Sequence, residues 1–394
     1  MVNVAPLLDL LLIALLLGYV AYGISSGFTR SVFAIAGIVA GIVAAVLLAP
    51  AISRAIPFPQ LRVAITIVAA VALIAIGHAV GAAVARALRT DGEVSKLRSI
   101  DRAAGGLAIG VLAALVVSTV SFSVSQLGSP LLSRTIADSA VIRTIHDLTP
   151  DSVDVRIGQL RALLSDKGVP FFTSELGTAG AQIPQIDTDS AALAAAADSV
   201  VRITGNAYAC GQAQTGTGFV VANERIVTNA HVVAGTERPV IEALNGQVLT
   251  GTIVYFDARD DLAVIAVPGL TADPLQMGIT SRPGTSTAIE GYPYGGPITI
   301  DAALVQHVSI TNSPDIYGSG GSPREVYTLA GQVNPGNSGG PLLTLGGKVV
   351  GAVFARSADQ ENVGYAMTLT ELRPVVDEAT SLSSTVSSGS CISG

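Results

Sequence analysis

Long runs without charged side chains fill the first third of the chain. Four stretches contain no Asp, Glu, Lys or Arg: Leu10–Thr29, Ser31–Ser53, Val63–Ala85 and Ala103–Ser133. Each is long enough for a helix to cross the hydrocarbon core of a bilayer, which takes about 20 residues. The alternative is a soluble domain, but it would need four core helices that lack a polar face. The pattern therefore predicts an all-α four-helix transmembrane bundle over residues 1–127.

The charges between these stretches predict the orientation of the bundle. Cytoplasmic loops carry an excess of Lys and Arg. Arg30 lies between the first and second stretches, and only Arg54 and Arg62 flank the loop between the second and third. The loop between the third and fourth stretches is the richest in basic residues, which are Arg86, Arg89, Lys96, Arg98 and Arg102. Both chain ends are therefore expected outside the cytoplasm. A cleaved signal peptide is not expected, because no basic residue precedes Arg30.

The pattern changes between residues 128 and 198. Two helical patterns within Ala140–Leu164 are separated by Thr149-Pro150-Asp151, which stops one helix and restarts another. Ser165–Thr188 is rich in Gly, Pro, Ser and Thr, as exposed linkers are. Such a linker is a natural site for proteolytic nicking, including self-cleavage. We expect an extracytoplasmic helical segment followed by a linker.

From residue 199 to residue 394 the pattern is one of short strands between turns. Alternating β-branched residues are interrupted by Gly, Pro, Asn and Asp, which is typical of all-β barrel domains. The expected strands include Val200–Thr204, Gly218–Ala222, Arg225–Asn229, Val248–Phe256 and Leu262–Val267. The length of this region suits two small barrels, so we predict an all-β double β-barrel.

Composition and cysteine content restrict the class of protein. Hydrophobic residues make up 49% of the 394 residues and charged residues only 13%, with a net charge of −7 and no basic stripe. Nucleic acid is therefore not an expected partner. Cys210 and Cys391 both lie in the part expected outside the cytoplasm, where disulfides persist. A bond between them would tie the tail to the start of the last domain; the alternative is two unrelated thiols.

Two polar residues lie at or inside the apolar stretches. Asp9 is expected near the outer interface, where its carboxylate stays hydrated, although a role in an ion path is the alternative. His78 lies inside the third stretch and either titrates there or bonds to a neighbouring helix. The sequence does not distinguish the two roles of His78.

Three motifs in the barrel region point to nucleophilic chemistry. Gly336-Asn337-Ser338-Gly339-Gly340-Pro341 places a serine among glycines, which let the backbone turn tightly and expose the hydroxyl group and nearby N–H groups. His231 ends Thr228-Asn229-Ala230-His231, and Asp261 begins Asp261-Leu262-Ala263-Val264. Acyl transfer by serine needs a base, an acceptor that orients the base, and donors for the oxyanion. The motifs predict a His, Asp, Ser triad.

These motifs resemble those of chymotrypsin-fold serine proteases, most of all the Htr (Deg) branch, over residues 199–380. Thr215–Val220 and Val350–Ala355 resemble two further strands of that branch. No PDZ domain is expected after them. The first 127 residues resemble the colicin V production (CvpA-like) family through their hydropathy, Asp9 and Gly27-Phe28. The pairing resembles membrane-anchored acid-resistance serine proteases (MarP-like), which implies a periplasmic enzyme needed under acid or oxidative stress.

The resemblance implies a role for each site residue. His231 is the expected general base, Asp261 its orienting carboxylate and Ser338 the nucleophile. The N–H groups of Gly336 and Ser338 are the expected oxyanion hole. Asp260 competes with Asp261, and Asp261 is favoured because Asp-Leu-Ala matches the motif from that position. The expected substrate pocket is modest and mainly apolar, and its residues are Gln332, Val353, Phe354 and Ala355.

The prediction is thus a serine endopeptidase, multi-pass in the cell membrane, with its protease domain outside the cytoplasm. Its expected partners are the lipid bilayer and protein or peptide substrates in the periplasm or cell wall. No cofactor or metal is expected, because the four histidines are dispersed and the two cysteines lack metal-ligand spacing. The alternatives are a catalytically silent protease-like binding module and a channel or transport bundle regulated by its protease domain.

Overall fold

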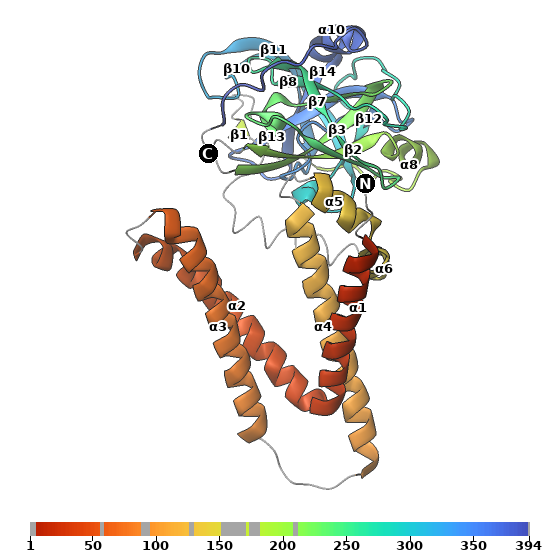
Figure 1. The fold of residues 1–394 in the computed structure, drawn as a ribbon. Coiled ribbons are helices and arrows are strands. Elements are labelled where there is room, and N and C mark those ends of the chain that lie inside the picture. Colours follow the sequence, from red (N-terminus) through yellow and green to blue (C-terminus); the bar gives the residue numbers. More distant parts are fainter. Residues whose placement is uncertain are drawn as a thin grey trace. The chain divides into compact units, whose positions relative to one another are not determined.

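The structure is a computed structural model, and it describes residues 5–55, 59–87, 95–125, 130–150, 171–172, 182–207 and 212–392. The chain divides into two compact units (Figure 1). One contains residues 1–121 and 139–148, and the other contains residues 122–138 and 149–394. The boundaries expected after residues 127 and 198 remain predictions. The second expected helical pattern, over residues 151–164, lies outside the described residues, as do residues 165–170 and 173–181 of the expected linker.

The first unit is helical. Its helices are α1 (Ala5–Ser26), α2 (Phe28–Ala55), α3 (Pro59–Ala87), α4 (Ser95–Ser125) and α6 (Ala140–Leu148). Each uncharged stretch therefore lies largely within one helix, although the fourth helix ends before Ser133. Within the described residues, two helical segments, 5–26 and 99–121, are long and apolar enough to cross a membrane. Crossing by all four helices stays a prediction.

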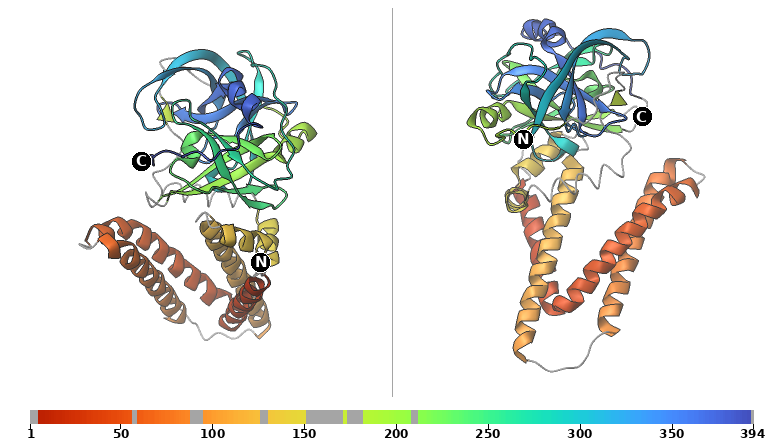
Figure 2. Two further views of the ribbon diagram at one scale, coloured as in Figure 1. Left: turned by 45° about the horizontal axis from the view of Figure 1, so that its top comes forward. Right: turned by 180° about the vertical axis from the view of Figure 1, so that it is seen from behind.

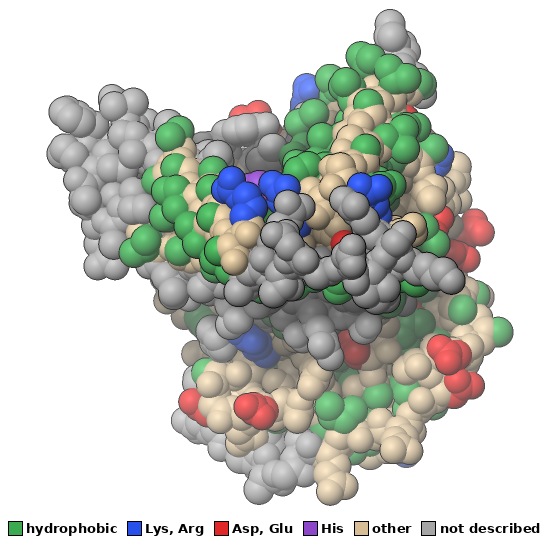
Figure 3. Space-filling model, turned by 90° about the horizontal axis from the view of Figure 1, so that it is seen from below, with side chains coloured by type: hydrophobic (Ala, Val, Ile, Leu, Met, Phe, Trp, Pro, Cys, Tyr) green, Lys and Arg blue, Asp and Glu red, His purple; other side chains and the backbone are tan. Residues whose placement is uncertain are grey.

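Large apolar side chains lie on the outer surface of these helices. Leu10 is 66% exposed and Leu107 is 71% exposed. In Figure 3 hydrophobic side chains cover much of the visible surface of the described helices. Soluble proteins rarely expose apolar surface of this extent. The surface therefore indicates association with a membrane.

Glycines bring these helices into backbone contact in two pairs. A Cβ atom at Gly77 of α3 would overlap the carbonyl oxygen of Gly37 in α2, and a Cβ at Gly41 would lie 2.7 Å from the carbonyl oxygen of Leu73. Gly23 of α1 meets Gly105 of α4 in the same way. The α2–α3 hairpin lies side by side in Figures 1 and 2. Close approach of small residues is how membrane helices associate when the solvent is as apolar as their side chains.

Replacing Gly77 with valine should separate α2 from α3. We expect a loss of about 1–3 kcal/mol, because an overpacked contact must shift backbone that cannot yield. Gly18→Val is the matched control, since no atom lies within 4 Å of its Cβ position. The measurement is unfolding of the full chain in mixed micelles with rising SDS, followed by circular dichroism. Equal midpoints for the two variants would contradict the packing.

Asp9 caps a helix. Its carboxylate accepts hydrogen bonds from Ser139 Oγ at 2.5 Å and from the backbone N–H groups of Ala140 and Val141 at 3.1 and 3.2 Å. Those N–H groups belong to the first turn of α6, where helices leave donors unsatisfied. The carboxylate therefore holds α6 against α1. Asp9 is only half-buried, so the expected hydration of its carboxylate stays a prediction. His78 lies in α3, and nothing further distinguishes its two roles.

The second unit carries two sheets of seven strands each among its described residues. The first sheet, in the order β6-β5-β2-β3-β4-β8-β7, contains β2 (Val200–Ala207), β3 (Gln212–Ala222), β4 (Arg225–Thr228), β5 (Val240–Ala243), β6 (Val248–Thr250), β7 (Thr252–Asp257) and β8 (Leu262–Ala266). These bounds agree with the five expected strands, except that Gly251 divides 248–256 into two.

The second sheet closes on itself through a β13–β14 pairing. Its strands, in the order β1-β13-β12-β9-β10-β11-β14, are β1 (Phe171–Phe172), β9 (Ser286–Gly291), β10 (Thr299–Ser313), β11 (Ser322–Gly331), β12 (Pro341–Thr344), β13 (Val349–Ser357) and β14 (Val363–Thr368). The remaining helices of this unit are α5 (Pro130–Asp138), α8 (Ala191–Ala197), α9 (Ala230–Val233), η2 (Pro293–Gly295) and α10 (Leu369–Glu378). The fold is a pair of chymotrypsin-like half-barrels.

Three apolar cores support the two half-barrels. Ile203 belongs to the core of the first half-barrel and Ile289 to that of the second. A third core joins the half-barrels and includes Phe219 and Ala288. Side chains alternate along β9, so Ile289 faces its own half-barrel while Ala288 faces the junction. The loops that carry the predicted site residues emerge beside this junction.

Candidate active site

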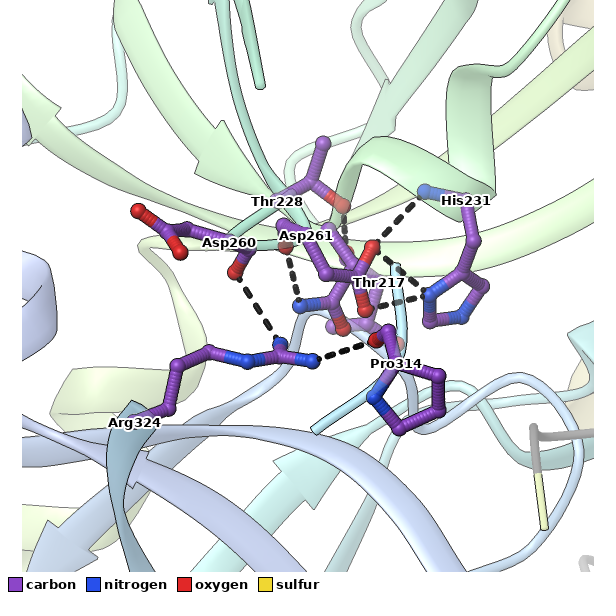
Figure 4. A network of polar contacts seen from close by, with 8 residues as sticks. Thr217, Thr228, His231, Asp260, Asp261, Pro314 and Arg324 are labelled. Atoms are coloured by element: carbon purple, nitrogen blue, oxygen red, sulfur yellow. Dashed lines mark hydrogen bonds and ion pairs between the residues drawn. The ribbon is translucent and has the colours of Figure 1, made fainter. Parts of the chain in front are cut away.

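His231 lies on α9, the short helix that follows β4, and faces Asp261 (Figure 4). Its Nδ1 atom is 2.8 Å from Asp261 Oδ2 and 3.0 Å from Oδ1. Its backbone N–H also donates to Asp261 Oδ1, at 2.9 Å. The side chains of both residues are mostly buried, with 10% and 6% exposed. The carboxylate therefore fixes the ring of His231 and directs its other nitrogen, Nε2, away.

Asp261 and its neighbour Asp260 point to different partners. Asp261 has a positive φ of 55°, which is uncommon for a residue other than glycine. Its carbonyl oxygen accepts from Asn229 Nδ2 at 2.9 Å. Asp260 instead accepts from Ser322 Oγ at 3.2 Å. Of the two candidate carboxylates, Asp261 is the one that contacts His231.

Ser338 lies in the tight turn that precedes β12. Gly336 and Gly339 have φ values of 101° and 81°, which only glycine adopts readily. Thr217 of β3 holds this turn: its N–H donates to Ser338 O at 2.9 Å and its hydroxyl donates to Gly336 O at 2.6 Å. A Cβ atom at Gly216 would lie 2.6 Å from the side chain of Val232 and 3.2 Å from Ser338 O. The serine turn is thus docked beside α9.

Several buried polar atoms in this region lack partners among the described residues, and two of them belong to the predicted triad. Neither Ser338 Oγ nor His231 Nε2 has a hydrogen-bond partner among the residues that the structure describes. Buried polar atoms without partners are rare in proteins and often belong to functional sites. A hydroxyl group and an imidazole nitrogen are also the pair needed to transfer a proton during serine attack.

Hydrogen bonds hold two carbonyl groups of the serine turn on the side opposite the adjoining N–H groups. Pro335 O accepts from Tyr294 N, and Asn337 O accepts from Gly340 N at 2.9 Å. The structure has no cis peptide bond in its described part, so the N–H of each peptide group points opposite its C=O. The N–H groups of Gly336 and Ser338 therefore point to the other side, and neither has an acceptor in the described part of the chain. Two free donors beside a serine can hold an oxyanion.

A cleft of about 470 Å³ opens beside the serine turn. It is lined by Gln332–Asn334 and Arg356–Val363. Of the expected pocket residues, only Gln332 lines this cleft, where its Nε2 atom donates to Asn362 Oδ1 at 3.1 Å. Val353, Phe354 and Ala355 lie in the protein core instead, because β13 has a bulge between Val353 and Ala355 and is covered on both faces.

Three charged residues lie on the wall of this cleft: Arg356, Asp359 and Glu361. The expected substrate pocket, modest and mainly apolar and formed by Gln332, Val353, Phe354 and Ala355, stays a prediction.

Comparisons with known proteins agree with this geometry. Residues 216–351 match the family model of the trypsin-like peptidase domain, and residues 8–150 match that of colicin V production protein. Serine protease Rv3671c of Mycobacterium tuberculosis is 33% identical over 273 residues, which are 67% of this chain and 68% of the relative. The chain belongs to the family of trypsin-like serine proteases.

A solved structure of that relative and one further protein extend the comparison of this trypsin-like protease. The crystal structure of the Rv3671c protease in its active form covers 56% of this chain and 100% of that chain, with a TM-score of 0.52 and 32% identity. A probable periplasmic serine endoprotease, DegP-like, from Halomonas elongata is 30% identical over 41% of this chain and 34% of its own length. The colicin V production match and the two apolar helices together indicate membrane association.

Sequence reasoning missed several residues that shape the site of this protease. Thr217 and Asn229 were quoted within motifs, but their bonds to the serine turn and to Asp261 were not predicted. Their positions next to catalytic motifs were the available signal. Arg324, which donates to Asp260 O, had no signal of this kind, since 64 residues separate the two. His307, one of the four dispersed histidines, is exposed on β10.

The two cysteines are only partly within the described chain. Cys210 lies outside the described residues. Cys391 lies beside the turn after α9: a Cβ atom at Gly235 would be 3.1 Å from its Sγ atom, and Gly235 N–H donates to Ser388 O at 3.0 Å. The tail of the protease therefore lies against the half-barrel that holds His231.

Proposed function

We propose that this protein is a membrane-anchored serine endopeptidase that cleaves proteins outside the cytoplasm through an acyl-enzyme. Ser338 Oγ attacks the scissile carbonyl carbon while His231 Nε2 takes the hydroxyl proton. The amine leaves with that proton, and water then hydrolyses the ester on Ser338 with His231 again as base. Asp261 holds the imidazole and stabilises its charged form.

One observation carries the proposal. Asp261 holds Nδ1 of His231 from one side, while His231 Nε2 and Ser338 Oγ are both buried without hydrogen-bond partners among the described residues. The paired N–H groups of Gly336 and Ser338 supply the oxyanion hole. A catalytically silent binding module would not need these atoms to be kept free at the cost of lost hydrogen bonds.

The cleft beside Ser338 is the proposed site for the substrate side chain. Gln332 takes the position where an acidic residue would favour Lys or Arg in the substrate, and its amide is bonded to Asn362. We therefore do not expect a trypsin-like preference for basic side chains.

We also propose that the bundle is multi-pass, with the protease outside the cytoplasm, and that Cys210 pairs with Cys391. The charge asymmetry of the loops supports this orientation. Cys210 falls between β2 and β3 in the sequence, and the placement of Cys391 against the half-barrel that contains these strands supports the pairing. The proposal includes a role under acid or oxidative stress. Its physical support is Glu290, a buried acid whose pKa burial raises to about 8.

Covalent labelling tests the proposed function. The full chain in detergent micelles is treated with a fluorophosphonate, which reacts with activated serines, and the labelled peptide is located by mass spectrometry. We expect one adduct, on Ser338, and parallel loss of the cleavage of fluorescein-labelled casein. Heat-denatured protein is the control and should take no label. Persistent cleavage without an adduct on Ser338 would overturn the triad, and neither labelling nor cleavage would favour the binding module.

A further inference from the structure

Arg324 crosses from the second half-barrel to the loop that carries Asp261. It lies near the start of β11 and is 3% exposed. Its Nη1 atom donates to Asp260 O at 3.3 Å and its Nη2 atom to Pro314 O at 2.8 Å, as Figure 4 shows. Its guanidinium carbon also lies 5.5 Å from the centre of the Phe354 ring, a favourable cation–π distance. The side chain is therefore held from three sides.

The contacts of Arg324 fix the backbone around Asp261. The two peptide groups that flank Asp261 each have their carbonyl held by a side chain: Arg324 holds Asp260 O, and Asn229 holds Asp261 O at 2.9 Å. The two side chains come from different half-barrels. Asp261 needs this support because its φ of 55° is strained for a residue with a Cβ atom, and such strain persists only where surroundings enforce it.

The charge of Arg324 is also placed next to the same loop. Burial lowers the pKa of Arg324, and Asp261, Asp260, Glu371 and Asp257 act in the opposite direction. A buried guanidinium is costly unless carboxylates or carbonyl groups face it. Arg324 therefore stays charged beside a carboxylate that must itself stay charged to hold His231.

We propose that Arg324 is a positioning residue for the catalytic triad. Its guanidinium group holds the Asp260–Asp261 peptide group so that the carboxylate of Asp261 faces His231. The inference rests on the proposed function. Without Arg324 the peptide group is free to rotate and relieve the positive φ of Asp261, which turns the carboxylate from the imidazole. Arg324 does not line the cleft, so we expect substrate binding to be spared.

The test compares Arg324→Gln, Arg324→Lys and Arg373→Gln in the full chain in detergent, with fluorescein-labelled casein as substrate. Arg373 is the matched control, because it belongs to the same half-barrel and also donates to a carbonyl, Gly278 O at 2.8 Å, but is exposed. We expect Arg324→Gln to lower kcat about 10- to 100-fold, as small displacements of catalytic groups do, with KM changed less than about threefold. Arg324→Lys should recover part of kcat, since it keeps the charge but reaches one carbonyl rather than two.

A spectroscopic readout separates positioning from general stability. The proton between His231 Nδ1 and Asp261 should give a far-downfield proton NMR signal in the wild type, and Arg324→Gln should weaken or lose it. If Arg324→Gln does not fold, Arg324→Lys is measured alone and should show a lower kcat at constant KM. Unchanged kcat, or an unchanged signal with kcat and KM altered together, would overturn the inference. A wild type that neither cleaves casein nor takes the fluorophosphonate would instead overturn the proposed function.

Discussion

Asp261→Asn is expected to lower kcat about 10⁴-fold, the scale of effect that loss of the correct histidine tautomer produces in triads of this kind. The reason lies in the two bonds that Asp261 makes to His231. Its Oδ1 atom accepts the backbone N–H of His231 at 2.9 Å, so the oxygen of an asparagine would stay there. The amide nitrogen would then face Nδ1, which must accept a hydrogen bond. The proton moves to Nε2, and the base for Ser338 is lost.

Asp260→Asn is the matched control. Asp260 uses its side chain on Ser322 and its carbonyl on Arg324, and an asparagine can keep both bonds. We expect kcat within about threefold of the wild type, as for ordinary substitutions of this kind. The measurement is the steady-state cleavage of labelled casein by the full chain, with melting temperatures recorded for both variants. A large loss in Asp260→Asn with none in Asp261→Asn would exchange their roles.

Glu290→Gln is expected to remove a strong pH dependence of stability. Glu290 lies on β9, is fully buried, and neither carboxylate oxygen has a partner among the described residues. It shares the face of Ala288, which points to the core between the half-barrels. Burial raises the pKa of Glu290 from 4.5 to about 8. The native protein thus holds this proton at pH values where an unfolded chain has released it.

The sign of the effect follows from proton binding. Between about pH 4.5 and 8 the unfolded state binds fewer protons than the native state, so the free energy of unfolding falls as pH rises. The free energy of unfolding is therefore unaffected by ionisation of Glu290 below about pH 4.5, and it decreases as pH rises toward 8. The loss has an upper limit of about 5 kcal/mol, because water entering around a buried charge reduces it. A protease with this property is better suited to acid than to alkaline surroundings.

Chemical denaturation at several pH values tests this prediction. The protein is first blocked with fluorophosphonate to prevent self-digestion. Glu290→Gln should match the wild type near pH 4.5 and exceed it increasingly up to pH 8, whereas the control Glu237→Gln, at an exposed site, should follow the wild type throughout. Parallel curves for wild type and Glu290→Gln would show that Glu290 does not hold its proton.

The sequence was sufficient for the parts of the site that local motifs define. Ser338 is recognisable because its turn requires glycines at Gly336 and Gly339, and their positive φ values follow from that requirement. The apolar stretches predicted the helices because a run without charges has few other structures open to it.

The sequence was insufficient where distant segments meet. The burial of Val353, Phe354 and Ala355 on β13 depends on a bulge and on the layers that cover the strand, and neither leaves a local pattern in the sequence. The bonds of Thr217 and Arg324 join different half-barrels, so no spacing along the chain reveals them. The bonds of Asp9 to α6 arise from a segment 130 residues away.

Thr217 has a consequence for when the enzyme can act. It belongs to β3, which the ribosome makes before the serine turn, and it holds that turn through Gly336 O and Ser338 O. A growing chain therefore carries base and carboxylate without a nucleophile. The serine turn, which is made later, adopts its conformation only against a folded first half-barrel. We therefore expect proteolytic activity only after both half-barrels have been made and folded.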